Sequence, residues 1–489
     1  MNSKTRQTYN LAVSVVTGES DNRFAKSDQC SLSNIVLIVL GGLLLCGCAQ
    51  TSPYHQNSAA NPRASIKPGP DYKLAFIEFG EQGSYQDTTQ LDNALDLIKR
   101  TPRPLVVTYV HGWHNNAGSA DALQRFPQML QQLGQSPAIR AAHFQVIGVF
   151  LGWRGEFITA PVLSELTFYN RKAAAERLAS NYDCYDAIAA ISEAARSYHP
   201  NGAQYTILVG HSFGGLVVER SVAHAINAEM HGHADSEKSL PADLILLLNP
   251  ASDSILSRQM IAALYARHIP DNRQLVVSLT STGDDATGKW FPFGTNLAAS
   301  SKVFDEVRAP SPDTKPHLES ERVFYTSTPG HNRFLLNHHT ARRPETVSNP
   351  EGKTAFDFNL EHNHAGHGFV TDSATSPGRL QVWKFEDLAS PFGFVEVPYW
   401  DVAVDPAIIK DHGDIWNDQA RAMMAAIFRM NFPRTLTATA VTSKPSILPK
   451  EAPKGAAATA TPTTTGAAAE KPSLQREPDR SRLQYQQSR

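Results

Sequence analysis

Short apolar runs alternate with amphipathic helical stretches through the middle of the chain. Several of the runs are apolar throughout, as expected of strands buried on both faces of a parallel sheet. The candidate strands are KLAFIEF (73–79), PLVVTYV (104–110), FQVIGVFL (144–151), YTILVG (205–210), LILLLN (244–249), LVVSLT (275–280) and YWDVAV (399–404). The candidate helices between them cover about 119–134, 170–197, 213–229 and 254–267. This alternation predicts a doubly wound α/β domain with a mostly parallel sheet over residues 71–432.

The two ends of the chain have other patterns. Residues 35–45 read IVLIVLGGLLL behind a region that contains four basic residues, which is typical of a signal peptide, here 1–47. The run is shorter than the about 20 residues that a bilayer-spanning helix needs, although an uncleaved anchor is the alternative. Residues 48–70 are rich in Ser, Pro and Asn and predict a flexible tether. Residues 433–489 are rich in Ala, Thr and Pro and predict a disordered tail.

Composition narrows the classes of partner. The 489 residues carry a formal net charge of −2, and charged residues make up 19% of the chain. This balance provides no basic surface for nucleic acid and no strong field for a charged substrate. Apolar residues, at 41%, are sufficient for a sizeable core. We therefore expect no nucleic-acid partner, and the composition does not indicate an oligomeric state.

The clearest chemical motif follows the strand at 205–210, where GHSFGG leads directly into a helix. Gly-x-Ser-x-Gly between a strand and a helix is the nucleophile elbow of the α/β-hydrolase fold. Its serine sits on a sharp turn that requires small neighbours, and Gly210 and Gly214 flank Ser212. The alternative is a glycine-rich turn with an incidental serine. The pattern favours Ser212 as a catalytic nucleophile.

The loop after the strand at 104–110 reads HGWHNNA and is a candidate for the wall facing this serine. Gly112 would allow close backbone approach, and the amides of Trp113 and Phe213 would form an oxyanion hole. His111 and Gly112 are also candidates for contact with substrate. For His111 we favour the alternative of a structural histidine bonded to neighbouring backbone. Arg154, in GWRG, would either face the pocket mouth or form a structural ion pair.

The chain order expected of this fold is serine, acid, histidine. His412 follows the last predicted strand by about eight residues and is the candidate general base. The acid has three candidates at strand ends: Asp284 first, Asp285 second and Asp253 third. Aspartate is also common in turns and at helix N-termini, and that interpretation is favoured for Asp253.

Residues 286–398 separate the candidate acid from the last strand and exceed what the fold requires. Such an insertion predicts a lid or cap over the pocket. The segment includes EHNHAGH (361–367), whose histidines could bind a metal. The spacing does not match a known zinc-binding helix, so we expect no metal and no cofactor.

Together these motifs resemble those of a group of bacterial α/β-hydrolase-fold proteins of largely unassigned substrate. The segments that carry the resemblance are FIEFGEQG (76–83), VHGWHNNA (110–117), GWRG (152–155), GHSFGG (210–215), NPASD (249–253), GDDATGKWFPFG (283–294) and HGDIW (412–416). The resemblance covers about 71–432 and implies the α/β-hydrolase fold. In similar sequences the aspartate that opens a D-x-A-T segment stands where Asp284 is here, which implies Asp284 as the acid.

A second resemblance concerns the end of the apolar run. Leu45, two small residues and Cys48 resemble the lipobox of bacterial lipoproteins, in which the cysteine is acylated and becomes the new N-terminus. The resemblance implies a lipoprotein anchored in a membrane of the bacterial cell envelope, at the outer membrane or the periplasmic face. Cys184 would then be the one remaining thiol, and we expect it to be a small buried apolar residue.

These observations predict a serine hydrolase that cleaves an acyl ester of a small molecule or a lipid through an acyl-enzyme. Amide or thioester cleavage would use the same groups. The alternative is a lipid-anchored binding or envelope protein that uses a hydrolase scaffold without catalysis, because fold alone does not establish activity.

Overall fold

The computed structural model describes residues 52–155, 168–197, 204–230, 241–265, 274–309, 317–348, 368–372, 379–387 and 397–431. The expected signal peptide, Cys48 and the expected disordered tail lie outside these residues. No helix within the described ranges combines the length and the apolar character that crossing a bilayer requires.

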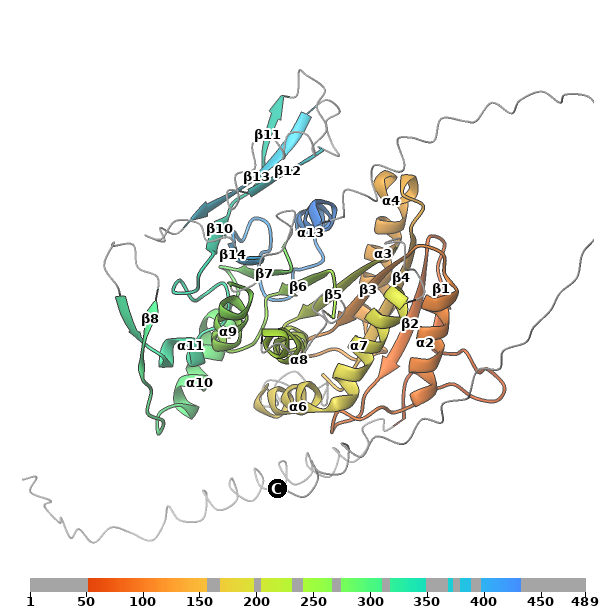
Figure 1. Ribbon diagram of the computed structural model, residues 1–489, viewed down its shortest axis with the longest axis horizontal. Coiled ribbons are helices and arrows are strands. Elements are labelled where there is room, and N and C mark those ends of the chain that lie inside the picture. The colour runs from red at the N-terminus through yellow and green to blue at the C-terminus, as the bar shows by residue number, and fades with distance from the viewer. Residues whose placement is uncertain are drawn as a thin grey trace, which may run out of the picture. The chain divides into compact units, whose positions relative to one another are not determined.

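A large, mostly parallel sheet forms the centre of the fold (Figure 1). Its strands are β1 (Ile66–Pro68), β2 (Tyr72–Glu78), β3 (Pro104–Val110), β4 (Gln145–Gly152), β5 (Tyr205–His211), β6 (Leu244–Leu248), β7 (Val276–Ser281), β10 (His338–Ala341), β11 (Glu345–Ser348), β12 (Gly368–Asp372), β13 (Arg379–Asp387) and β14 (Tyr399–Val404). The strand order is β1-β2-β4-β3-β5-β6-β7-β14-β10-β13-β11, and β12 pairs with β13. Strands β2 to β10 in this order are parallel, whereas β1 and β13 are antiparallel to their neighbours.

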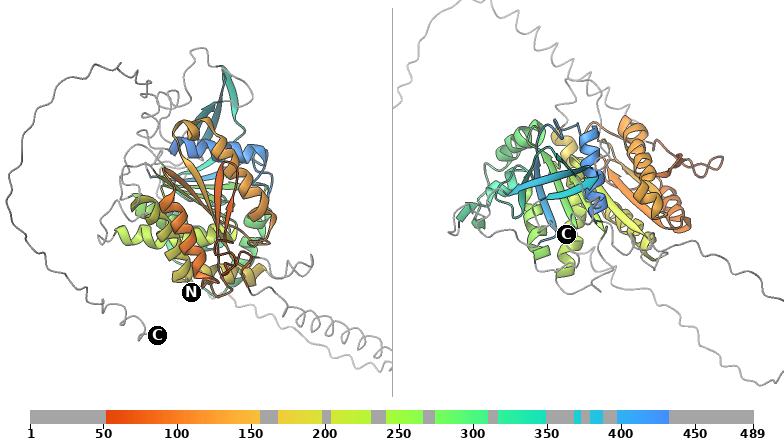
Figure 2. Two further views of the ribbon diagram at one scale, coloured as in Figure 1. Left: turned by 90° about the vertical axis from the view of Figure 1, so that its right-hand side faces the viewer. Right: turned by 90° about the horizontal axis from the view of Figure 1, so that it is seen from above.

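Helices cover both faces of the sheet, which makes this an α/β fold (Figure 2). Apolar residues of five helices pack on one face: α2 (Thr88–Arg100), α6 (Phe168–Ser180), α7 (Tyr182–Ser197), α8 (Phe213–Met230) and α9 (Ser254–Tyr265). Apolar residues of three others pack on the opposite face: α3 (Phe126–Gln135), α4 (Pro137–Ala141) and α13 (Asp418–Asn431). The remaining elements are π-helical turns η2 (Asp121–Arg125) and η4 (Ala286–Trp290), helices α10 (Phe291–Ala298) and α11 (Arg322–Thr326), and a hairpin of β8 (Glu306–Ala309) and β9 (His317–Ser320).

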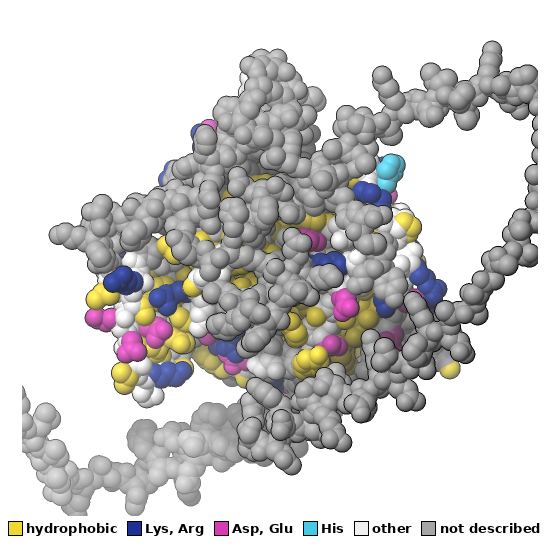
Figure 3. Space-filling view, viewed as in Figure 1, with side chains coloured by type: hydrophobic (Ala, Val, Ile, Leu, Met, Phe, Trp, Pro, Cys, Tyr) yellow, Lys and Arg dark blue, Asp and Glu magenta, His cyan; other side chains and the backbone are white. Residues whose placement is uncertain are grey.

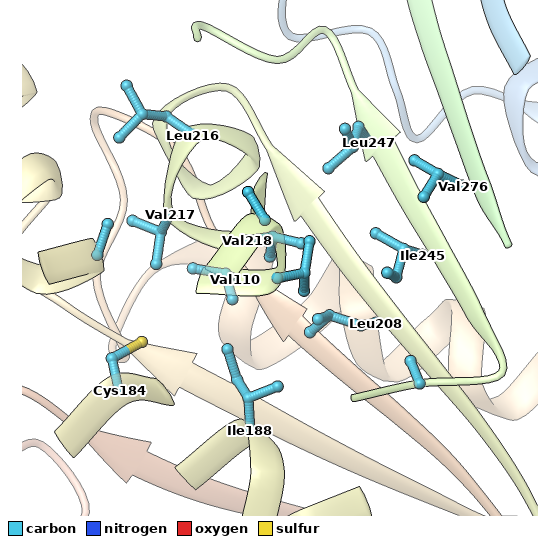
Figure 4. Packing of buried hydrophobic residues seen from close by; sticks show 14 of the residues in the cluster. Val110, Cys184, Ile188, Leu208, Leu216, Val217, Val218, Ile245, Leu247 and Val276 are labelled. Carbon is cyan, nitrogen blue, oxygen red and sulfur yellow. The ribbon is translucent and has the colours of Figure 1, made fainter. Parts of the chain in front are cut away.

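A cluster of buried apolar side chains packs beneath β5 (Figure 4). Leu208 of β5 packs among Val217 and Val218 of α8 and Ile188 of α7. Cys184 lies in the same cluster with no exposed surface, and its burial raises the pKa of the thiol to about 12. Cys184 therefore fills space as an apolar residue, as expected from the sequence. This packing fixes the strand and the helix that flank Ser212.

All seven strands expected from the apolar runs are present, within two residues of their expected ends. The helix expected over 170–197 is two helices, α6 and α7. The break falls at Asn181, whose side-chain oxygen accepts a hydrogen bond from the amide of Asp183 over 3.0 Å. Asparagine favours such capping contacts over a helix interior, and this explains the break.

Two expectations need correction. The flexible tether expected over 48–70 does not extend past residue 51, because residues from 52 onward pack on the body and Ile66–Pro68 form β1. The insertion at 286–398 is not only a lid. Its strand β10 pairs with β14 inside the main sheet, and β13 continues that sheet. Strand β10 (HHTA) is too short and too polar for a hydrophobic pattern to reveal it.

Candidate active site

The strands that carry the candidate residues end together at one edge of the sheet. Val110 at the end of β3 is in register with Gly210 of β5. His211 of β5 is in register with Leu248 of β6, and Ser281 of β7 with Val404 of β14. Because parallel strands share one direction, the loops that follow them meet at this carboxyl edge. Ligand sites in open α/β sheets form at such an edge.

Ser212 occupies the turn between β5 and α8 with a φ of 57°, a left-handed conformation that is strained for a serine. Its backbone is held from both sides, since its amide donates to Leu248 and its carbonyl accepts from the amide of Ala251, each over 3.0 Å. The turn is crowded. A Cβ on Gly214 would lie 2.1 Å from the carbonyl oxygen of Val110, so only glycine fits there.

Three side chains that are far apart in sequence meet at this turn. The Nε2 atom of His412 lies 2.7 Å from the Oγ atom of Ser212, and its Nδ1 atom lies 2.7 Å from the Oδ2 atom of Asp284. A carboxylate accepts hydrogen bonds, so Nδ1–H of His412 donates to Asp284. In the neutral ring, Nε2 is then free to accept from the hydroxyl of Ser212. The geometry has the donor order of a serine–histidine–aspartate triad.

Hydrogen bonds to the carboxylate of Asp284 favour its ionised form. The amides of Ala286 and Thr287 donate to its Oδ1 atom over 2.9 and 3.2 Å, and the hydroxyl of Thr287 donates to Oδ2 over 2.6 Å. Burial alone would raise the pKa of Asp284. The hydrogen bond and the charge of His412, with the bonds from Thr287, outweigh burial and lower that pKa overall. The carboxylate can therefore orient His412 and stabilise its protonated form.

The other two candidate acids are engaged elsewhere. The Asp285 side chain is 63% exposed and pairs with Lys289 over 2.7 Å. The Asp253 carboxylate lies 3.9 Å from Arg220 on α8, next to the start of α9. Of the three aspartates, Asp284 is the one whose carboxylate contacts His412.

Sequence reasoning missed the residues that hold the His412 loop. The side-chain amide of Asn249 donates to the carbonyls of Asp411 and His412 over 3.2 and 3.0 Å. Nε2–H of His211 donates to the carbonyl of His412 over 2.9 Å. The hydroxyl of Ser281 donates to the carbonyl of Ile409 over 2.5 Å. Each of these residues ends or directly follows a strand at the carboxyl edge. That position is the feature of the sequence that could have marked them as part of the site.

The loop after β3 faces the serine through Gly112. A Cβ at that position would lie 2.5 Å from the Cβ of Ser212 and 3.0 Å from the carbonyl oxygen of His211. The neighbouring His111 is fully buried, and its Nε2 atom accepts from the amide of Trp153 over 3.0 Å. Burial lowers the pKa of His111 to about 4. His111 thus ties two loops together, which is the structural role that the sequence analysis favours, and its contact with substrate stays a prediction.

Three aromatic rings pack together beside the residue that follows the serine. Phe168 lies between Trp113 and Phe213, with ring centroids 5.2 and 5.1 Å away respectively. Trp113 also stacks on His114 at 4.0 Å. Arg154 is partly exposed, and its carbonyl accepts from Arg171 over 2.8 Å. The partly buried rings of Trp113 and Phe168 thus pack against the core that contains Phe213, and a role of Arg154 at the pocket mouth stays a prediction.

Some histidines of the insertion lie within the described residues and others outside them. His331 packs behind the site, where its Nε2 donates to the hydroxyl of Thr287 over 3.3 Å. The segment EHNHAGH (361–367), considered for a metal, lies outside the described residues. In the part of the chain that the structure describes, no group of three or more His, Cys, Asp and Glu side chains is arranged to hold a metal ion.

Comparisons with known proteins add a distant structural likeness. No protein-family model matches the sequence, and no curated protein matches it. A structure of phospholipase PlaB from Legionella pneumophila aligns with a TM-score of 0.21 and 13% identity, over 49% of this chain and 46% of that one. A second structure of PlaB, in complex with thio-NAD, aligns with a TM-score of 0.24 and 9% identity, over 62% of this chain and 93% of that one. The chain thus spans about half the length of the first neighbour, and at these TM-scores the activity of PlaB does not transfer to it.

Proposed function

We propose that this protein is a serine hydrolase with the α/β-hydrolase fold that cleaves acyl esters. The observation that carries the proposal is the pair of 2.7 Å contacts that link Ser212, His412 and Asp284. The left-handed backbone of Ser212 supports it, because that conformation is the mark of a nucleophile elbow. A chance meeting of these three side chains would not also place the serine on a strained strand-to-helix turn.

In the proposed reaction, His412 removes the proton from the hydroxyl of Ser212 as the serine oxygen attacks the acyl carbonyl carbon. A tetrahedral intermediate forms, and the protonated His412 then donates its proton to the departing alcohol oxygen. This step leaves the acyl group on Ser212 as an ester. A water molecule activated by His412 then attacks that ester, which releases the carboxylic acid and restores the serine.

The developing oxyanion needs donors, and the proposal assigns them to the backbone. Phe213 is the first residue of α8, and the first amides of a helix have no acceptor within the helix. The amide of Trp113 follows Gly112, which lies against Ser212. Two such donors are each worth about 10²- to 10³-fold in rate. The partly buried rings of Trp113 and Phe168, which pack near the residue that follows Ser212, suit an apolar acyl group, so we infer a small-molecule or lipid ester as substrate.

The test is active-site labelling followed by turnover. The purified full chain is treated with a fluorophosphonate probe, beside Ser212→Ala and the matched variant Ser221→Ala. Ser221 is a buried serine on the same helix and has no part in the proposed reaction. We expect the native chain and Ser221→Ala to be labelled and Ser212→Ala to be unlabelled. Acyl esters of short and long chain then identify the preferred substrate.

Two results would overturn the proposal. Equal labelling of native chain and Ser212→Ala would assign the reaction to another residue. A folded native chain that neither reacts with the probe nor hydrolyses any ester would favour the alternative of a non-catalytic envelope protein.

A further inference from the structure

An apolar ridge stands exposed on the helix that follows the candidate acid. Trp290, Phe293 and Leu297 are 66%, 66% and 69% exposed. They lie three and four residues apart, which places them on one face of η4 and α10. Tyr169 of α6, 55% exposed, packs with its hydroxyl against Gly294 of the same helix. We call Tyr169, Trp290, Phe293 and Leu297 the α10 ridge. On the side of the molecule where α10 lies, Figure 3 shows apolar side chains next to charged ones.

Hydrogen bonds connect the helix that carries the α10 ridge to the candidate active site. Oδ1 of Asp284 accepts from the amides of Ala286 and Thr287, which are the first two residues of η4. η4 continues without a break into α10. The carboxylate that holds His412 therefore also caps the helix that presents the ridge. A surface that binds the ridge would lie within one short helix of the reacting groups.

The first described segment of the chain is attached to the same edge of the sheet. The amides of Tyr54 and His55 donate to the two carboxylate oxygens of Glu78 over 2.7 and 2.8 Å. Glu78 is the last residue of β2 and is in register with Gly152 at the end of β4. The apolar run at 35–45 ends nine residues before Tyr54. Nine residues reach at most about 30 Å, so an anchor predicted at this run would be tethered within about 30 Å of Tyr54.

The candidate nucleophile lies between these two features. Along the strand order, β5 is three strands from β2 and two strands from β7. At about 4.8 Å per strand, Ser212 is about 15 Å from the Glu78 attachment and about 10 Å from the strand that leads to the ridge. In Figure 1, the arrow of β2 points toward the side of the molecule where α6 and α10 lie. The Glu78 attachment, the serine and the start of η4 thus lie along the carboxyl edge.

We propose that the carboxyl edge of the sheet docks on a lipid bilayer, with the α10 ridge inserted into the interface. A bilayer is the occupant that two features favour together: the apolar run at 35–45 is predicted from the sequence to attach the chain to a membrane, and tryptophan and phenylalanine on a helix face are side chains that favour the bilayer interface. The inference deepens the proposed function, because docking at this edge brings Ser212 to esters of membrane lipids, but the docking itself does not require catalysis.

The insertion test uses the full chain reconstituted on vesicles of phosphatidylcholine and phosphatidylglycerol. Its readout is tryptophan emission with brominated phosphatidylcholine compared with the unbrominated lipid. The chain has six tryptophans, and Trp290 is the one among them with more than a third of its surface exposed. We expect brominated lipid to quench the native emission and Trp290→Phe to lose at least half of that quenching. Native chain that is bound to vesicles and not quenched would overturn the proposal.

The functional test compares the double variant Phe293→Ser with Leu297→Ser against the apolar control Phe293→Leu with Leu297→Met. We expect the serine variant to raise the apparent KM for a vesicle-embedded ester at least five-fold, with kcat on a soluble short-chain ester unchanged. The control should behave as native chain. Leu123→Ser, 51% exposed on η2 before the helix of the opposite face, should change neither value. An equal KM in the serine variant and the native chain would contradict docking through the ridge.

Two further outcomes separate the sources of failure. If no ester is hydrolysed but brominated lipid quenches Trp290, the docking surface stands and the proposed function fails. If sedimentation velocity shows a dimer that Phe293→Ser dissociates, while lipid causes no quenching, the ridge binds a second copy of the chain and the docking proposal fails.

Discussion

The side-chain amide of Asn249 donates to the main-chain carbonyl of His412 over 3.0 Å, so the end of β6 holds the loop that carries the candidate base. Asn249 has a φ of 43°, and its Oδ1 atom accepts from the amide of Ser281 over 2.8 Å. One asparagine thus joins three loops of the carboxyl edge. Its left-handed backbone is a conformation that asparagine tolerates better than most residues.

Asn249→Ala removes these bonds and frees the loop. We expect kcat/KM for an acyl ester to fall up to about 100-fold, because a misplaced His412 removes the proton of Ser212 less efficiently. Labelling of Ser212 by a fluorophosphonate should slow by a similar factor, although the serine is unchanged. Stopped-time labelling measures this rate. A labelling rate equal to that of native chain would show that the loop holds His412 without Asn249.

Asp284→Asn tests the acid against its immediate neighbour. The Oδ1 atom would still accept from the amides of Ala286 and Thr287, so the new NH2 group would face His412 and donate to Nδ1. This fixes the wrong tautomer and removes the counter-charge, and we expect kcat to fall about 10³- to 10⁴-fold. Asp285→Asn is the matched control, because that carboxylate is 63% exposed and contacts Lys289. The control should retain native turnover. Equal losses in both variants would point to damage of the turn rather than loss of the acid.

Gly112→Ala tests how tightly the facing loop approaches the serine. The new methyl group would lie 2.5 Å from the Cβ of Ser212, so one of the two backbones must shift. We expect ester hydrolysis to fall at least 100-fold, with a loss of stability of about 1–3 kcal/mol. At Gly80 the nearest atom to an added Cβ is 3.7 Å away, so Gly80→Ala should keep both properties. Activity assays and thermal unfolding check the pair.

A pH dependence of stability is expected from Glu219, which is fully buried on α8 and accepts from the hydroxyls of Ser252 and Ser257. Burial raises its pKa from 4.5 to about 7, despite the serine bonds that lower it. Below pH 4.5 the carboxyl is protonated in the folded and the unfolded chain. As pH rises to about 7, the unfolded state ionises first, and stability falls by about 3 kcal/mol from this group.

Glu219→Gln removes that titration while keeping the size of the side chain. The free energy of unfolding of native chain, measured against denaturant at pH 4.5, 5.5, 6.5 and 7.5, should fall relative to the variant and then level off. A constant difference between the two chains across this range would mean that Glu219 does not titrate there.

The sequence predicted the parts of the site that depend on local pattern. The turn at Ser212 follows from a strand, a glycine-flanked serine and a helix, all within one short segment. His412 follows from its place after the last strand that the apolar pattern reveals. The choice among Asp253, Asp284 and Asp285 depended on likeness to other sequences, because all three follow strands and turn geometry alone does not separate them.

The rest depends on contacts between distant segments. Asn249 and His211 act through carbonyls of a loop more than 160 residues away, and no local pattern reports such a bond. Strand β10 is four residues long and polar, and its place in the sheet is set by pairing with β14 and β13. The contacts of Tyr54 and His55 with Glu78 are likewise invisible in a segment whose composition predicts a tether.

Strand β1 shields the open flank of the sheet. It covers the outer side of β2 with three residues, where Ile66 faces Ala75 and Pro68 faces Lys73. On β1 itself, Pro68 has no amide hydrogen and Lys67 is charged, and both discourage a further strand from adding to this edge. A chain shortened to begin at residue 71, where the apolar pattern starts, would lose this shield. It would leave the unpaired backbone of β2 available to another molecule, and precipitation through edge-to-edge pairing is the expected cost of that truncation.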